Sequence, residues 1–304
     1  MIESNTIEMA ATRATVTSAL FSIKTKIALI VSIFLWSSAF VFIRTALKGY
    51  SPGSLALFRF LIASFCMLVI YCYRFRQRET FQNRHFYGLL LFGAIGLGCY
   101  NYFLNYGEIS VSAGIASFII SQSPLISMFF AILFLKEKWS LNTLLGIFIS
   151  IIGVGLIVLG ENSELKLGMG LIFILIATFV NALYTVLQKF FLNKYNATDV
   201  TIYIIWSGTV ALLIFSPELI HDLKTAPLTA TLSAIYLGIF PAAIAYLAWS
   251  YALAAIPASR CVSFLYFMPI IATLLGWLCL GEIPAVLSLL GGLIALAGVW
   301  WANK

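Results

Sequence analysis

The chain repeats itself at a constant offset of 145 residues. When each residue of the first half is aligned with the residue 145 positions later, no gap is needed between the first apolar stretch and the last. The identical pairs include Pro124 with Pro269, Glu137 with Glu282, Tyr50 with Tyr195, Gly93 with Gly238, Tyr106 with Tyr251, Ala113 with Ala258, Gly146 with Gly291 and Gly153 with Gly298. A repeat of this length predicts two similar structural units that pack together.

The composition places both units in a membrane. Hydrophobic residues make up 62% of the chain and charged residues only 10%, which excludes an ordinary water-soluble domain. A helix needs about 20 apolar residues to cross the hydrocarbon core. Ten such stretches follow one another, at 26–47, 54–73, 86–106, 111–134, 141–160, 167–190, 199–217, 230–252, 258–280 and 284–302.

The distribution of basic residues predicts the orientation. Thirteen of the Lys and Arg residues that flank the spans fall on one side, and three fall on the other. Cytoplasmic loops carry the excess of Lys and Arg. We therefore expect a protein of the bacterial inner membrane with both termini on the cytoplasmic side. The net charge of +7 therefore needs no nucleic-acid partner to explain it.

Each half has five spans, so the second half must enter the membrane from the opposite face. We expect an all-α integral membrane protein with ten transmembrane helices, arranged as two inverted five-helix repeats. The expected domains are a cytoplasmic tail at 1–25, a first repeat at 26–160 and a second repeat at 161–304.

Several segments resemble EamA-type transporters of the drug/metabolite transporter superfamily. They are WSSAFVFIR at 36–44, LALFRFLIA at 55–63, PLISMFFAILFLKEK at 124–138, PIIATLLGWLCLGE at 269–282 and GGLIALAGVW at 291–300. The resemblance implies a ten-helix secondary carrier with a cavity between its halves, commonly an exporter of amino acids or other small metabolites. This chain departs from many of these transporters at Arg44, where they have Lys.

Polar side chains inside spans are costly in lipid, so they should line a cavity or bond to a neighbouring helix. The resemblance implies that the helices around the cavity are the first, third, fourth, sixth, eighth and ninth, and the polar residues cluster on these spans. The candidate substrate-binding residues are Trp36, Ser38, Asn101, Tyr102, Asn105, Ser121, Gln122, Asn181, Tyr184, Tyr246, Trp249 and Tyr266. The alternative is that they hold helices together or form the interfacial aromatic belt.

Two prolines and three cations carry further hypotheses. Pro124 and Pro269 fall within spans and are candidate hinges, or static kinks that make room for the cavity. Arg44 and Lys189 occupy equivalent positions in the halves and are candidate mouth charges that attract an anionic group, or anchors of helix ends. Arg59 lies in the second span, where we expect it to snorkel or bind carbonyl groups.

The sequence lacks the motifs of several other protein classes. There is no GxxxxGK[ST] loop, no HExxH and no GxSxG, and the five cysteines have no CxxC spacing, so we expect no catalytic residue, no metal and no cofactor. All eleven acidic residues fall in tails, connections or span ends. Because a proton-driven pump needs a titratable group in its path, facilitated transport or exchange is favoured.

The resulting hypothesis is a secondary transporter that moves a small polar or zwitterionic metabolite, an amino acid or a similar solute, by alternating access. Export is favoured only by the resemblance. Its partners are the solute and the membrane lipids, and its oligomeric state is open. The alternatives are a membrane-embedded enzyme or assembly factor acting on a lipid-linked substrate, which would need an acid/base pair or nucleophile, and a channel.

Overall fold

All regular secondary structure in the described residues is helical. The computed structural model describes residues 22–74, 81–127, 130, 141–160, 169–256, 261–262 and 264–302. Its first half contains α2 (Ile23–Ala46), α3 (Pro52–Tyr73), α4 (Asn83–Gly93), the π-helix η2 (Ala94–Cys99), α5 (Tyr100–Gly107), α6 (Ala113–Ile120) and α8 (Leu141–Gly160).

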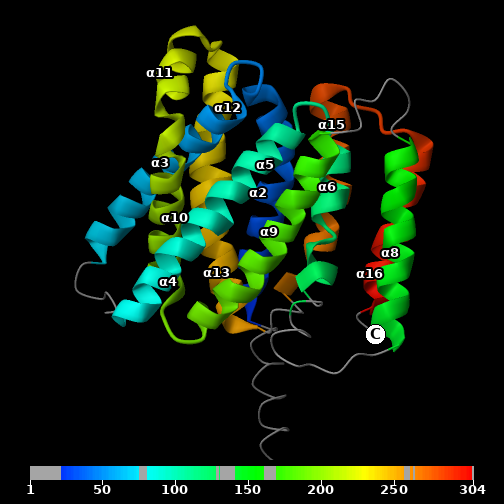
Figure 1. Cartoon of the computed structure of the whole chain (residues 1–304), viewed down its shortest axis with the longest axis horizontal. Helices are drawn as coiled ribbons and strands as arrows, with labels where there is room; N and C mark the ends of the chain where they lie inside the picture. Colours follow the sequence, from blue (N-terminus) through cyan, green and yellow to red (C-terminus); the bar gives the residue numbers. More distant parts are fainter. Residues whose placement is uncertain are drawn as a thin grey trace, which may run out of the picture.

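The second half follows a similar order, with η3 and α11 between its second and third long helices (Figure 1). It contains α9 (Met169–Leu192), α10 (Ala197–Leu212), the 3₁₀-helix η3 (Leu213–Phe215), α11 (Ser216–Thr225), α12 (Leu228–Ile239), the π-helix η4 (Phe240–Ile244), α13 (Ala245–Ala255), the 3₁₀-helix η5 (Phe264–Phe267), α15 (Met268–Leu280) and α16 (Val286–Ala302).

Six helical runs are long and apolar enough to cross a membrane, namely Ile23–Ala46, Pro52–Tyr73, Asn83–Gly107, Met169–Leu192, Ala197–Thr225 and Leu228–Ala255. Shorter apolar helices cover Ala113–Ser127, Phe264–Leu280 and Val286–Gly298. The helical membrane fold expected from the sequence is therefore confirmed. The number of ten spans stays a prediction.

Equivalent positions of the two halves start their helices in the same way. Ser51 caps α3 by accepting a hydrogen bond from the Ser54 amide (3.3 Å), with Pro52 in the first turn. Asn196, which lies 145 residues after Ser51, caps α10 by accepting from the Thr198 amide (3.0 Å). Both side chains satisfy an amide that a helix N-terminus leaves without a partner. The repeat in the sequence thus reappears as a repeat in local structure.

Equivalent residues also touch each other. The hydroxyls of Ser64 in α3 and Thr209 in α10 are hydrogen-bonded at 2.6 Å, and these residues are 145 positions apart. Ser150 in α8 donates to the carbonyl oxygen of Ala295 in α16 at 2.9 Å, again across 145 positions. Contacts between equivalent positions are those that a two-fold relation between the halves produces.

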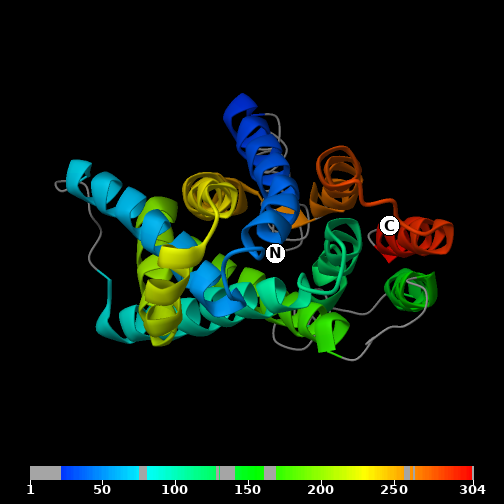
Figure 2. The ribbon, with the colours of Figure 1, turned by 90° about the horizontal axis from the view of Figure 1, so that it is seen from above.

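Helices α8 and α16 form a pair at one edge of the molecule, beside α6 and α15 (Figures 1 and 2). Their close approach depends on glycine. A Cβ on Gly153 would lie 2.4 Å from the backbone nitrogen of Ala295, and a Cβ on Gly298 would lie 2.6 Å from the backbone nitrogen of Ser150. Small residues let helix backbones approach closely in membranes.

Two equivalent helical runs, one in each half, contain a π-helical segment. Segment η2 interrupts the run from α4 to α5, and η4 interrupts the equivalent run from α12 to α13. Pro241 lies at the start of η4, whereas η2 contains Gly96 and Gly98. A Cβ on Gly96 would lie 2.7 Å from the ring of Tyr184, so glycine there admits a neighbouring aromatic side chain. Such segments are frequent at functional sites.

The two prolines of the hinge hypothesis lie at breaks between helical segments. Pro124 follows a turn that begins at Ser121, the residue after α6. Pro269 is in the first turn of α15, directly after η5. In a first turn the missing amide removes no helical hydrogen bond. The breaks sit at equivalent positions, and a hinge role for them stays a prediction.

The glycine contact between α8 and α16 gives a matched test. We expect Gly153→Ala to lower the melting temperature of the purified protein in detergent, because its Cβ would meet backbone atoms that cannot rotate away, at a cost of about 1–3 kcal/mol. Gly155→Ala lies in the same helix and would meet nothing within 4 Å, so it should leave the melting temperature unchanged or raise it. Equal melting temperatures for the two variants would contradict this packing.

Candidate functional site

The central cavity has two adjoining compartments that share Trp36, Tyr100, Tyr246 and Met268. The Arg59 compartment, about 20 Å³, is also lined by Ala39, Phe40, Ile43, Arg59, Asn101 and Leu104. The Asn181 compartment, about 30 Å³, is also lined by Ile120, Asn181, Tyr184, Thr185, Trp249 and Leu265. These residues come from both halves of the chain.

Both compartments of the cavity are small. A single buried water needs about 10–15 Å³, so the two compartments hold a few waters at most. A metabolite the size of an amino acid does not fit. Within the described residues the cavity is therefore too small for such a solute, and neighbouring groups must move apart before one can enter.

Aromatic side chains form the wall between the compartments. The ring of Trp36 lies 5.3 Å from the ring of Tyr246 and 5.1 Å from that of Trp249. The Trp36 indole nitrogen donates to the carbonyl oxygen of Pro241 in η4 at 3.1 Å. The π segment thus positions an aromatic ring of the other half. Tyr184 stacks on Phe92, with ring centroids 4.9 Å apart.

Arg59 brings a charge into the cavity. Its side chain is 3% exposed, so it does not snorkel to an interface as expected from the sequence. One terminal nitrogen donates to Oδ1 of Asn105 at 3.3 Å, and Asn105 in turn donates to the carbonyl oxygen of Pro52 at 3.1 Å. Within the described residues the Nε atom of Arg59 has no hydrogen-bond partner. The guanidinium thus keeps a donor that no described residue satisfies.

The structure divides the candidate substrate-binding residues into two groups. Half of them line the cavity, namely Trp36, Asn101, Asn181, Tyr184, Tyr246 and Trp249. Asn105 lies behind the lining, where it orients Arg59. Contact with a solute stays a prediction for all of them, since the cavity is closed.

The remaining candidates have other contacts. Ser38 bonds to the Tyr236 hydroxyl at 2.8 Å, and Tyr102 stacks on Phe215 with ring centroids 5.1 Å apart. The Ser121 hydroxyl donates to the carbonyl oxygen of Phe118, as does the Gln122 amide. Tyr266 lies half-buried in η5, outside the lining of both compartments.

The residues that sequence reasoning missed include Arg59 and Tyr100 in the lining and Glu108 beside it. Arg59 was assigned a structural role although an arginine inside an apolar span is itself a signal of a polar pathway. Tyr100 was passed over for Tyr102, two positions along the same helix. Glu108 was grouped with peripheral acids, whereas its side chain is completely buried.

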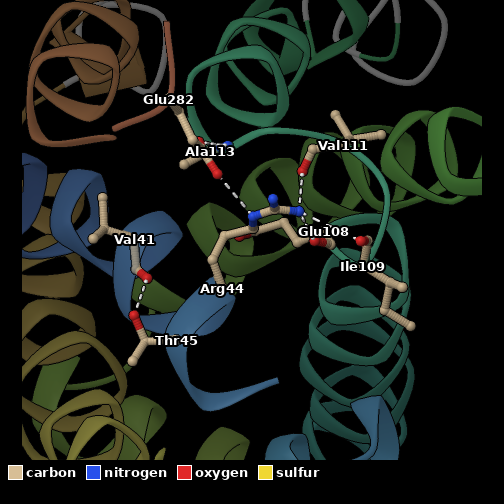
Figure 3. A network of polar contacts seen from close by, with 8 residues as sticks. All are labelled: Val41, Arg44, Thr45, Glu108, Ile109, Val111, Ala113 and Glu282. Carbon is tan, nitrogen blue, oxygen red and sulfur yellow. Dashed lines mark hydrogen bonds and ion pairs between the residues drawn. The ribbon is translucent and has the colours of Figure 1, made fainter. Parts of the chain in front are cut away.

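Arg44, in the last turn of α2, is the centre of a network of polar contacts (Figure 3). Its Nε atom forms an ion pair with Glu282 at 2.9 Å. One terminal nitrogen donates to the carbonyl oxygens of Glu108 (2.7 Å), Val111 (3.3 Å) and Ile109 (3.4 Å). The second carboxylate oxygen of Glu282 accepts from the backbone amide of Ala113 at 2.9 Å, so this network ties the end of α2 to the loops after α5 and α15.

Lys189 repeats this arrangement in the second half. Its Nζ atom donates to the carbonyl oxygens of Leu253 (2.5 Å), Ile256 (3.0 Å) and Ala254 (3.5 Å). These residues lie 145 positions after Glu108, Val111 and Ile109. Glu137, the counterpart of Glu282, falls outside the described residues. Both predicted mouth charges therefore bind backbone carbonyls at the end of a π-containing helical run.

The EamA-like transporter family matches the chain twice, over residues 23–159 and 168–304. The chain is 38% identical over 265 residues to the "Uncharacterized transporter YdfC" of Bacillus subtilis, which covers 87% of this chain and 86% of that protein. It is 34% identical over 282 residues to a "Probable terminal-alkyne amino-acid exporter" of Streptantibioticus cattleyicolor, which covers 91% of this chain and 92% of that protein.

A solved structure, titled only as the crystal structure of a protein, covers 91% of this chain and 96% of its own, with a TM-score of 0.64 and 17% identity. That likeness supports the fold alone. The two family matches and the long alignments to named transporters agree with a helical membrane fold around a central cavity. This chain belongs to the EamA-like transporter family, and it is a membrane transporter rather than an enzyme.

Proposed function

We propose that this transporter moves a small metabolite with a carboxylate group, of the amino-acid class, across the bacterial inner membrane by alternating access. The observation that carries the proposal is the buried Arg59 guanidinium, which lines the cavity among aromatic side chains. A buried cation is costly in a membrane interior, and a bound carboxylate offsets that cost.

The chemistry of Arg59 suits a carboxylate. A guanidinium offers a planar set of donors that matches the two oxygens of a carboxylate, and such charge-assisted bonds are stronger than neutral ones. Asn105 accepts a hydrogen bond from one terminal nitrogen of Arg59, which restrains the orientation of the group. The free Nε of Arg59 is one of the donors that the solute would engage.

The rest of the cavity suits the other parts of a zwitterionic solute. Trp36, Tyr246 and Trp249 present aromatic faces that attract a cation and cover an apolar side chain. Asn101 and Asn181 add amide groups in the two compartments. An amide left unpaired costs about 1–3 kcal/mol, so these groups discriminate against solutes that do not bond to them.

Alternating access follows from the inverted repeat that the odd number of spans per half predicts. The contacts between Ser64 and Thr209 and between Ser150 and Ala295 support a two-fold axis through the molecule. If the repeats are 26–160 and 161–304, inversion places the Arg44 tie at the external end and the Lys189 tie at the cytoplasmic end. Both ties are formed in this structure, as a closed state requires.

The transport direction is proposed from one relative. The named amino-acid exporter is 34% identical over most of both chains, and it favours export of an amino-acid-like solute here. The absence of a phosphate-binding loop from the sequence favours facilitated transport or exchange over an ATP-driven pump.

Counterflow in proteoliposomes tests the role of Arg59. Vesicles loaded with the twenty unlabelled amino acids should accumulate labelled amino acids through the wild-type protein. Arg59→Gln should raise the KM at least about 30-fold, since loss of a buried charged partner costs about 2–5 kcal/mol. Arg59→Lys, which keeps the charge but loses the planar donor set, should fall between them.

Arg74→Gln is the control, because Arg74 pairs with Asp199 at the end of α3, away from the cavity. It should leave the KM unchanged. A folded Arg59→Gln variant with the wild-type KM for every amino acid would overturn the carboxylate assignment.

Labelling from the two sides of the membrane tests the two ties. We take Thr185→Cys, which lines the cavity, in a protein whose five native cysteines are replaced. Glu282→Gln should increase its labelling by a membrane-impermeant thiol reagent from the external side roughly fivefold, because a partly buried ion pair contributes about 1 kcal/mol to the closed state.

Lys189→Gln removes the tie at the other end. It should increase labelling of the same cysteine from the cytoplasmic side instead. The same sidedness for both variants would contradict the inverted arrangement of the two ties.

A further inference from the structure

The two compartments of the cavity differ in the polar groups that they present. The Arg59 compartment contains a guanidinium, which is a cation and a donor. None of the described residues that line the Asn181 compartment is Lys, Arg or His. Apart from its aromatic residues, the polar side chains of that lining are Asn181 and Thr185, both on α9. Their hydrogen bonds decide which atoms they can offer to a solute.

The side-chain amide of Asn181 has a defined orientation. The Ser123 hydroxyl donates its single hydrogen to the carbonyl oxygen of Ile120 at 2.6 Å. Toward Asn181 it can therefore act only as an acceptor, and Nδ2 of Asn181 donates to it at 3.1 Å. Ser123 lies outside the lining of both compartments. With Nδ2 directed at Ser123, the acceptor Oδ1 is the atom that Asn181 offers to a solute.

Thr185, one turn further along α9, also offers an acceptor. Its hydroxyl donates to the backbone carbonyl oxygen of Asn181 at 3.0 Å, so its only hydrogen is used within the helix. The remaining lone pairs of Oγ1 are free to accept in the compartment that Thr185 lines. Because the two residues are four positions apart, their side chains share one face of α9.

The aromatic walls of the Asn181 compartment also favour a positive charge. The ring of Trp36 lies 5.1 Å from that of Trp249 and 5.3 Å from that of Tyr246. The faces of such rings attract an ammonium group, whose N–H donors need acceptors such as amide and hydroxyl oxygens. A carboxylate, in contrast, would find no cation among the described lining residues of this compartment.

The internal repeat shows that this division is specific to the lining. Asn181 lies 145 positions after Trp36, and Ile204 lies 145 positions after Arg59. Neither polar side chain therefore has a polar counterpart of its own kind in the other half. The first half supplies the cation of the cavity, and the second half supplies the acceptors of the Asn181 compartment.

We propose that Asn181 and Thr185 bind the protonated amino group of the solute, so that an amino acid lies across both compartments with its carboxylate on Arg59. The compartments share part of their walls, as one bound solute requires. Arg59 repels a second positive charge in its own compartment, which directs the ammonium group to the other. This inference rests on the proposed function, and it narrows the solute from a carboxylate to a zwitterion with a free amino group.

Competition between matched solutes tests the site. The reporter is counterflow, in proteoliposomes, of the labelled amino acid that the wild-type protein exchanges fastest. The competitors are the same amino acid, unlabelled, and the 2-hydroxy acid with the same side chain. The hydroxy acid keeps the carboxylate and replaces the ammonium group by a hydroxyl. It should inhibit the wild-type protein at least about tenfold more weakly, because the charge-assisted hydrogen bonds of the ammonium group are lost.

Asn181→Leu and Thr185→Val remove the two acceptors with little change in side-chain volume. Each should raise the KM of the amino acid roughly tenfold and reduce its advantage over the hydroxy acid. Thr178→Val is the matched control, because Thr178 of α9 donates in the same way to the carbonyl oxygen of Ile174 (2.7 Å) but lies outside the lining. It should leave that advantage unchanged.

Two results would overturn the ammonium site and leave the carboxylate role of Arg59 standing. One is equal inhibition of the wild-type protein by the amino acid and its hydroxy acid. The other is an unchanged advantage of the amino acid in both Asn181→Leu and Thr185→Val. If the folded wild-type protein exchanges no amino acid at all, the proposed function fails and the ammonium site fails with it.

Discussion

A guanidinium buried in an apolar helix bundle is the constraint on which the site depends. Arg59 is almost completely inaccessible, and an arginine in the middle of a membrane costs about 2.5–3.5 kcal/mol on insertion scales. Asn105 offsets part of that cost and is held in turn by the carbonyl of Pro52. Arg59 lines a cavity whose walls are aromatic, and in the proposed function the cost of its charge is offset when an anionic solute binds.

The two-fold character of the chain explains how such a site can be closed at both ends. The contacts between residues 145 positions apart, the matched caps at Ser51 and Asn196, and the matched ties of Arg44 and Lys189 repeat one design in both halves. Each tie uses a long basic side chain to bind carbonyls that a helix end leaves without partners. In the proposed alternating-access cycle, each end opens when its own tie breaks.

Helical membrane architecture and the repeat were predictable because they rest on composition and spacing, which do not depend on packing. Six residues that line the cavity were also predicted, since polar groups inside spans must be satisfied within the protein. The choice between Tyr100 and Tyr102 was not predictable. It depends on the rotation of α5, which follows the π segment η2 and packs against α9. Glu108 and Glu218 both come just after an apolar stretch of the sequence. In the structure, however, Glu108 is buried and Glu218 is exposed.

Recognition of the solute carboxylate by Arg59 is the central claim, and competition by paired solutes tests it most directly. Counterflow of labelled amino acids through the wild-type protein should be inhibited by unlabelled amino acids and hardly at all by their methyl esters, which lack the negative charge. In Arg59→Gln the amino acids should lose that advantage. Equal inhibition by acids and esters in the wild-type protein would contradict the account.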